Sequence, residues 1–123
     1  MCGRFAFYSP SEAAAALFGV DGSTPVAPRY NIAPTQDVAA IRNNESGDRE
    51  LVSLRWGLVP SWAKDAAIGN RMINARAETL AEKPSFRAAY KRRRCLILAD
   101  GFYEWQKIAG QKTKQPHYIT LAD

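Results

Sequence analysis

Residues 95–108 read CLILADGFYEWQKI, and this stretch decides the fold class. Its first part, Cys95 to Ala99, is a continuous apolar run of the kind that forms a buried strand. Cys95 is therefore expected to be an inert, buried thiol. Asp100-Gly101 predicts a turn or bulge, and Phe102 to Ile108 resumes a strand pattern. The stretch indicates a chain in which strands dominate.

The segments on either side add further strands and short helices. Strands are predicted at residues 2–8, 38–41, 51–56 and 117–121. Helices are predicted at 12–18, 76–81 and about 84–91, the first opened by a capping box at 9–12 and stopped by Gly19. Residues 57–70 are expected to form an ordered loop. The prediction is one α+β domain, mostly antiparallel β, with short helices at its flanks.

Composition excludes several classes of protein. No apolar run approaches the ~20 residues of a membrane span, and no signal peptide is visible at the N-terminus, so a cytoplasmic protein without a membrane partner is expected. Two cysteines are too few for a disulfide scaffold. With one histidine and no Cys-x-x-Cys spacing, neither a metal site nor a cofactor is expected.

The charge is unevenly distributed along the chain. Residues 1–50 hold four Lys/Arg and six Asp/Glu, whereas residues 51–123 hold thirteen and six. The first part is therefore acidic and the second strongly basic. A basic segment favours an anionic partner, of which nucleic acid is the commonest, although many small basic proteins are merely soluble.

Cys2 is the candidate nucleophile. A small second residue allows removal of Met1, which leaves cysteine with a free α-amine beside its thiol. Such a 1,2-aminothiol condenses with an aldehyde: the amine forms an imine, and the sulfur closes a thiazolidine ring in an intramolecular step. Amine and thiol titrate near pH ~8 and ~8.5, so both are partly nucleophilic at neutral pH. The alternative is that a cysteine at this position is incidental.

Four polar residues are further candidates, each with a structural alternative. Arg4 is expected to share a strand face with Cys2 and to hold a phosphate, or to be solvated. Asn74 and Arg76 can orient a sugar and grip a phosphate, or Asn74 can cap a helix. Glu104, among aromatic residues, is expected to be desolvated with a raised pKa suited to proton transfer, or to pair across strands.

Flat aromatic faces occur among positive charges. The tryptophans are Trp56, Trp62 and Trp105, and the arginines are Arg29, Arg55 and Arg71. Proteins that bind single strands combine these residue types, because bases stack on aromatic rings. At least one of the tryptophans is expected to belong to the core. The run Lys91-Arg92-Arg93-Arg94 is expected to cap a helix end and stay solvated.

Five ordered blocks together resemble the SOS-response-associated peptidase (SRAP) family of abasic-site sensors. They are MCGRF (1–5), RYNIAP (29–34), RWGLVPSW (55–62), INARAET (73–79) and ADGFYEW (99–105). The resemblance implies a barrel-like, mostly β fold. It also implies that Cys2 bonds to the opened sugar of an abasic site in single-stranded DNA as a thiazolidine.

The same resemblance implies a role for each matching residue. Asn74 would hydrogen-bond the sugar and Glu104 would move protons. Arg4 and Arg76 would hold flanking phosphates. The side chains that would line the DNA path are Pro34, Trp56 and Trp105.

The chain departs from the family in length. SRAP domains usually approach twice 123 residues, and their second half carries an active-site histidine. The family motif does not place its histidine at His117, so that role is not transferred. The chain is therefore expected to be the N-terminal portion of one SRAP domain, incomplete at its C-terminus.

Two other functions compete with covalent capture. The family name suggests a thiol peptidase with Cys2 as its N-terminal nucleophile, which needs the thiol and an oxyanion hole but not the amine. A single-strand binder without chemistry would treat intact and abasic strands alike.

Overall fold

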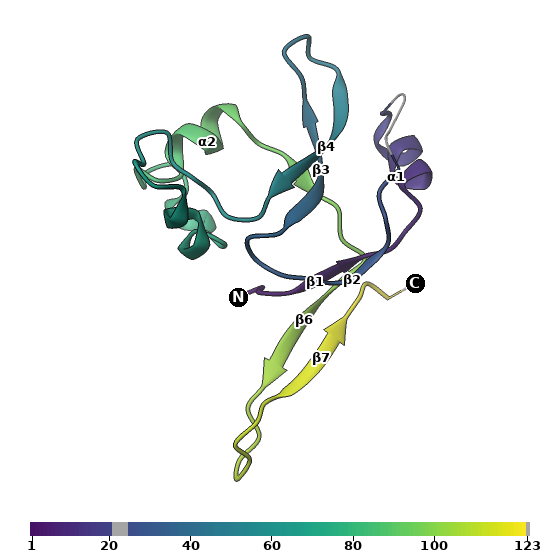
Figure 1. The fold of residues 1–123 in the computed structure, drawn as a ribbon, viewed down its shortest axis with the longest axis vertical. Helices are drawn as coiled ribbons and strands as arrows, with labels where there is room; N and C mark the ends of the chain where they lie inside the picture. Colours follow the sequence, from purple (N-terminus) through teal and green to yellow (C-terminus); the bar gives the residue numbers. More distant parts are fainter. Residues whose placement is uncertain (21–24, 123) are drawn as a thin grey trace.

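The computed structural model describes residues 1–20 and 25–122. Its strands form two antiparallel sheets, with two α-helices and two short 3-10 helices around them (Figure 1). The elements are β1 (Phe5–Phe7), α1 (Ser11–Phe18), β2 (Arg29–Ile32), β3 (Asp37–Asn43), β4 (Arg49–Arg55), η1 (Ala66–Arg71), η2 (Ala77–Thr79), α2 (Arg87–Arg92), β5 (Leu96–Ile97), β6 (Gly101–Gln106) and β7 (Gln115–Ile119). The predicted α+β class with antiparallel strands is confirmed, and within the described residues both sheets are open.

The first sheet places the N-terminal strand between two partners from distant parts of the chain. Its strand order is β2-β1-β6-β7. Phe5 of β1 lies opposite Ile32 of β2 on one side and Phe102 of β6 on the other. The β6–β7 hairpin projects away from the rest of the molecule (Figure 1). Residues just before β1 are therefore held beside β6.

The second sheet is built on a long hairpin. Its order is β4-β3-β5, and β3 pairs with β4 over its whole length, from Asp37↔Arg55 to Asn43↔Arg49. The polar turn predicted after β3 is present, since the Asn44 N–H donates to the Asp48 carbonyl at 2.8 Å. β5 adds only a short pairing on the other side of β3.

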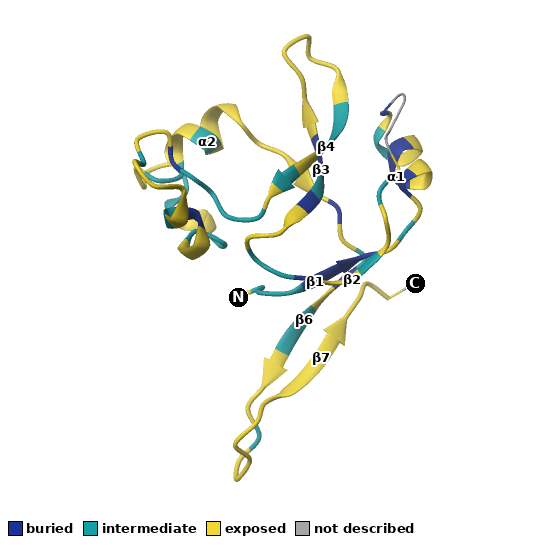
Figure 2. Ribbon diagram, in the orientation of Figure 1, coloured by how far each residue is buried: buried dark blue, intermediate teal, exposed yellow. Residues whose placement is uncertain are grey.

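The core lies between the sheets and under α1 (Figure 2). Apolar burial of this kind stabilises the fold by roughly 25 cal/mol per Å². The buried residues of the core are Phe5, Phe7, Ala14, Ala15, Val20, Ile32, Val38, Ile41 and Leu98. Trp56 packs against them, as expected for at least one tryptophan. The outer parts of both hairpins are exposed.

The first helix confirms its predicted position but not its predicted cap. α1 ends before Gly19, whose left-handed backbone and N–H, donated to the Ala16 carbonyl, close the helix as expected. The capping box is wrong, because Pro10 is the N-cap and no side chain caps the helix. Ser9 instead donates its hydroxyl to Asp100, and buried Ser11 accepts from the Val26 N–H. Both serine hydroxyls therefore bind tertiary partners and do not cap the helix.

Other boundaries shifted where tertiary pairing prevailed over local pattern. β2 was not predicted, because a short polar RYNI segment has no clear strand period. The helix predicted at 76–81 is only the 3-10 turn at 77–79, and Gly101 opens β6 directly without a turn. No helix within residues 1–20 and 25–122 is long and apolar enough to cross a membrane.

The prediction that residues 95–99 form a buried strand is wrong in most of its length. Only Leu98 is buried, whereas Leu96 is 56% exposed and Ile97 46% exposed. Cys95 is exposed rather than buried. β5 pairs on one side only, so its side chains border an open groove instead of a core.

Candidate functional site

Cys2 meets Asn74 although 72 residues separate them. The Asn74 side-chain amide donates to the Cys2 carbonyl at 2.7 Å, and the Cys2 thiol donates to the Arg4 carbonyl at 3.7 Å. Cys2 is half-buried and, together with Asn74, lines a wide open groove of about 2040 Å³. The candidate nucleophile is therefore anchored by its backbone and still borders open space.

The loop after β4 returns the chain to Cys2. The Trp56 indole N–H donates to the Ile73 carbonyl at 2.9 Å, and the Leu58 N–H donates to the Met72 carbonyl at 3.0 Å. The backbone of this loop passes close to itself at Gly57. Only glycine fits there, because a Cβ would lie 2.5 Å from the Gly69 carbonyl oxygen. These contacts hold the backbone directly before Asn74.

Trp56 also links this loop to the core and to Pro34. Its ring lies 5.3 Å from that of Phe5 between centroids. Its backbone pairs with the turn that follows Pro34, accepting from the Thr35 N–H and donating to the Gln36 carbonyl, both at 2.9 Å. Pro34 and Trp56 are thus neighbours.

Glu104 reaches the N-terminus from the middle of β6. Its carboxylate lies 3.5 Å from the Met1 amino nitrogen. Its side chain is 42% exposed, so the expected desolvation is only partial. The aromatic neighbours on β6 alternate with Glu104 and point to the opposite face of the sheet. Across the strands His117 is its register partner, and the His117 ring contacts Gln106 at 3.0 Å.

Arg4 does not share a strand face with Cys2, because β1 begins only at Phe5. Its guanidinium donates to the Asn31 side-chain oxygen on β2 at 2.9 Å. The Arg4 Nε is buried and has no hydrogen-bond partner in the described part of the chain. Asn31, which the sequence did not single out, therefore orients this arginine.

The remaining predicted residues are exposed around the same region. Arg76 is exposed two positions after Asn74, at the start of η2. Trp105 follows Glu104 on β6 and is 41% exposed. The structure thus places Asn74 against Cys2 and Glu104 against Met1, with Arg76 and Trp105 close to them in sequence.

Asp100 is a further anchoring residue that sequence reasoning missed. Its carboxylate accepts hydrogen bonds from the Tyr8 N–H at 2.6 Å, the Ser9 N–H at 2.8 Å and the Ser9 hydroxyl. Burial raises the pKa of Asp100, but these hydrogen bonds outweigh it, so the pKa lies below its ordinary value. An acidic residue directly before a strand was the signal that could have found it.

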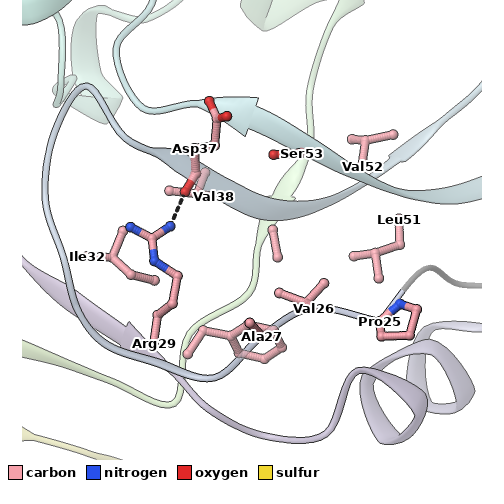
Figure 3. A pocket seen from close by; sticks show the side chains of 12 residues that line it. Pro25, Val26, Ala27, Arg29, Ile32, Asp37, Val38, Leu51, Val52 and Ser53 are labelled. Atoms are coloured by element: carbon pink, nitrogen blue, oxygen red, sulfur yellow. Dashed lines mark hydrogen bonds between the residues drawn. The ribbon is translucent and has the colours of Figure 1, made fainter.

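A second hollow, of about 420 Å³, lies between the segment around Val26 and the β3–β4 hairpin (Figure 3). Its lining is largely apolar, and Arg29 crosses its edge to donate to the Asp37 carbonyl. None of the predicted site residues lines it. The Cys2 region is therefore the candidate site.

Comparison with known proteins identifies the family. The model of the family "SOS response associated peptidase (SRAP)" matches residues 1–123. The chain is 50% identical over 124 residues to the abasic site processing protein YoqW of Bacillus subtilis (strain 168), covering 98% of this chain and 54% of that protein. It is 35% identical over 142 residues to the abasic site processing protein HMCES of Rattus norvegicus, covering 97% of this chain and 40% of HMCES.

Solved structures show the same fold. A crystal structure of a Bacteroides thetaiotaomicron protein superposes with a TM-score of 0.82 at 25% identity, over 99% of this chain and 55% of that one. A phage-related protein from Bordetella bronchiseptica superposes with a TM-score of 0.78 at 31% identity, over 97% of this chain and 55% of that one. The chain spans about half the length of YoqW and of these two solved proteins. Since the family match extends over all 123 residues, the chain belongs to the SRAP family.

Proposed function

We propose that this chain captures abasic sites in single-stranded DNA through a thiazolidine bond to Cys2, after Met1 is removed. The observation that carries the proposal is the pair of contacts on the first two residues. Asn74 donates to the Cys2 carbonyl at 2.7 Å, and Glu104 lies 3.5 Å from the amine of Met1, the residue whose removal would expose the Cys2 amine. Two distant segments thus converge on one N-terminus, which an incidental cysteine would not need.

The proposed reaction uses the amine and then the thiol. The Cys2 amine, having given a proton to the Glu104 carboxylate, adds to the aldehyde carbon of the opened sugar. Proton return from Glu104 lets the hydroxyl leave as water, which forms the imine. The Cys2 sulfur then adds to the imine carbon, its proton passes to nitrogen, and the five-membered ring closes. Only water is lost, and no oxidant or cofactor takes part.

The other predicted residues would position the DNA. Arg76, exposed beside Asn74, and Arg4, oriented by Asn31, would hold phosphates on either side of the lesion. Pro34 and Trp56 are neighbours through their backbone contacts and would form one wall of the path, with Trp105 forming another. These assignments rest on position and residue type.

The test is single-turnover crosslinking to a single-stranded oligonucleotide with one abasic site, followed by denaturing electrophoresis and intact mass. We expect a heat-stable adduct whose mass equals protein without Met1, plus DNA, minus one water. Cys95→Ser is the matched control, because it removes the other thiol, which is exposed. No adduct from protein that has lost Met1, or an adduct carrying Met1, would overturn the proposal.

A thiol peptidase is the second candidate, favoured by the family's description and by the half-buried Cys2 thiol. It predicts turnover of peptides that is lost in Cys2→Ala. It does not require a free amine, so protein that retains Met1 should also hydrolyse peptides. Peptide hydrolysis without DNA adducts would select this function.

A further inference from the structure

Five aromatic side chains form a connected cluster across the four-stranded sheet. The rings of Tyr8 and Tyr30 stack with their centroids 5.2 Å apart and an interplanar angle of 17°. The Tyr118 hydroxyl donates to that of Tyr8 at 3.4 Å, and the Tyr118 ring lies 4.9 Å from Tyr103. The ring centroid of Trp105 lies 6.4 Å from that of Tyr103. We call these five residues the aromatic face.

The aromatic face lies on the side of the sheet opposite Phe102 and Glu104. Residues alternate along β6, so Tyr103 and Trp105 point one way while Phe102 and Glu104 point the other. Phe102 lines the groove that contains Cys2, whereas no member of the aromatic face lines that groove or the smaller hollow. The aromatic face is therefore distinct from the groove, and Trp105 is the one member that the proposed DNA path also includes.

This surface is open to solvent. Tyr30 is 64% exposed, Trp105 and Tyr118 are each 41% exposed, and Tyr8 is 37% exposed. The β6–β7 hairpin projects away from both α-helices, and its strands are mostly exposed (Figures 1 and 2). Neighbouring exposed aromatic rings are typical of a binding surface.

We propose that the aromatic face stacks the unpaired bases that flank the lesion in a single DNA strand. This inference rests on the proposed function and adds to it a second contact surface. Tyrosine and tryptophan offer flat apolar rings with polar tips, which match bases better than they match an aliphatic protein surface. Phe102 and Ile119, on the other face of the hairpin, lack polar tips.

Position and charge favour the same occupant. Trp105 belongs to the aromatic face and follows Glu104 directly, so the face begins beside the candidate site. The Arg4 guanidinium donates to Asn31, the residue after Tyr30. The Arg4 carbonyl also accepts from the Tyr103 N–H at 2.9 Å. A strand on these rings would thus have a cation near its phosphates.

The test uses Tyr30, because it is the most exposed ring and its removal leaves the core intact. Affinity for intact, lesion-free single strands is measured by fluorescence anisotropy for the wild type and for Tyr30→Ala, Tyr30→Leu and Tyr30→Phe. Stacking of one base contributes about 1–3 kcal/mol, so we expect Tyr30→Ala and Tyr30→Leu to bind about tenfold more weakly. Tyr30→Phe keeps the ring and should bind like the wild type. Tyr90→Ala, at another 43% exposed tyrosine, is the matched control.

A second measurement separates this inference from the proposed function. Thiazolidine formation with a small aldehyde such as glyceraldehyde should proceed equally in Tyr30→Ala and the wild type. If no variant captures aldehyde, the proposed function fails while the intact-strand binding still tests the aromatic face. Equal affinities of Tyr30→Ala and Tyr90→Ala would overturn the inference. So would an association of the protein with itself that Tyr30→Ala alone abolishes while strand binding stays unchanged.

Discussion

At the scale of single residues, the proposed chemistry depends on two groups of Cys2, its α-amine and its thiol. Serine keeps the amine and replaces sulfur with a much weaker nucleophile. We predict that Cys2→Ser forms only a reversible imine with abasic DNA and no heat-stable adduct, and that Cys2→Ala behaves in the same way. Heating the samples before denaturing electrophoresis, with and without prior borohydride reduction, distinguishes imine from ring. A heat-stable adduct from unreduced Cys2→Ala would show that sulfur is not required.

Asp100 is the residue whose ionisation we expect to affect stability. Its folded-state pKa lies below the ordinary value of 3.8, because hydrogen bonds from Ser9 and Tyr8 outweigh the effect of burial. The carboxylate therefore contributes stability above pH ~4 that is lost as pH falls through its lower folded-state pKa. This contribution ties the end of β1 to the start of β6.

We predict that Asp100→Asn lowers the free energy of unfolding at pH 7 by about 1 kcal/mol, because the amide donates where the carboxylate accepts. The difference from the wild type should shrink as pH falls below about 4 and through the lower folded-state pKa of Asp100. Urea unfolding at pH 7 and pH 3 measures both quantities. Asp48→Asn, at an exposed turn carboxylate, is the control. A difference that stays constant across this range would exclude Asp100 as the titrating group.

At the scale of elements, the loop between β4 and Asn74 determines how the site is assembled. Gly57 has a φ of +136°, and a Cβ there would lie 2.5 Å from the Gly69 carbonyl oxygen. Both features disfavour a side chain. Because this close approach turns the chain back toward Cys2, a shift here would move Asn74.

We predict that Gly57→Ala destabilises the protein by about 1–3 kcal/mol and slows abasic-site capture beyond the effect of unfolding. Gly110→Ala is the matched control, since its φ is also positive, at +80°, but a Cβ there meets nothing within 4 Å. Thermal melts and single-turnover capture of both variants provide the comparison. Equal losses in the two variants would mean that backbone strain alone, and not the Gly69 contact, matters.

At the scale of the whole molecule, positive charge is concentrated in residues 51–123, which hold thirteen Lys/Arg against six Asp/Glu. Arg76 is exposed beside Asn74, whereas Lys112 is exposed in the distant β6–β7 loop. Neutralising a phosphate releases a counterion, so each such contact adds about 0.7 to the slope of log affinity against log salt for single strands.

We predict that Arg76→Ala flattens the salt dependence of single-strand binding by about that amount, and that Lys112→Ala leaves it unchanged. Anisotropy titrations between 50 and 300 mM NaCl measure the slope. Equal slopes for Arg76→Ala and the wild type would remove Arg76 from the phosphate contacts. Equal flattening by both variants would instead indicate that net charge alone steers the DNA.

The sequence by itself determined the α+β class, the first helix, the β3–β4 hairpin and the family. Local periodicity and ordered motif blocks carry this information, because they depend on residue type and on spacing within short segments. The SRAP blocks also pointed to Cys2, Asn74 and Glu104 before any contact was visible.

Only the tertiary structure decided what lies next to what. It paired β2 and β6 with β1, and it placed the Ser9 hydroxyl against Asp100 instead of at the helix end. It also left Cys95 exposed directly before β5, a strand that pairs on one side only. It also brought the Glu104 carboxylate to the amine of Met1. These outcomes depend on pairings between residues tens of positions apart, whose free energies compete with local propensity and leave no trace in a local pattern.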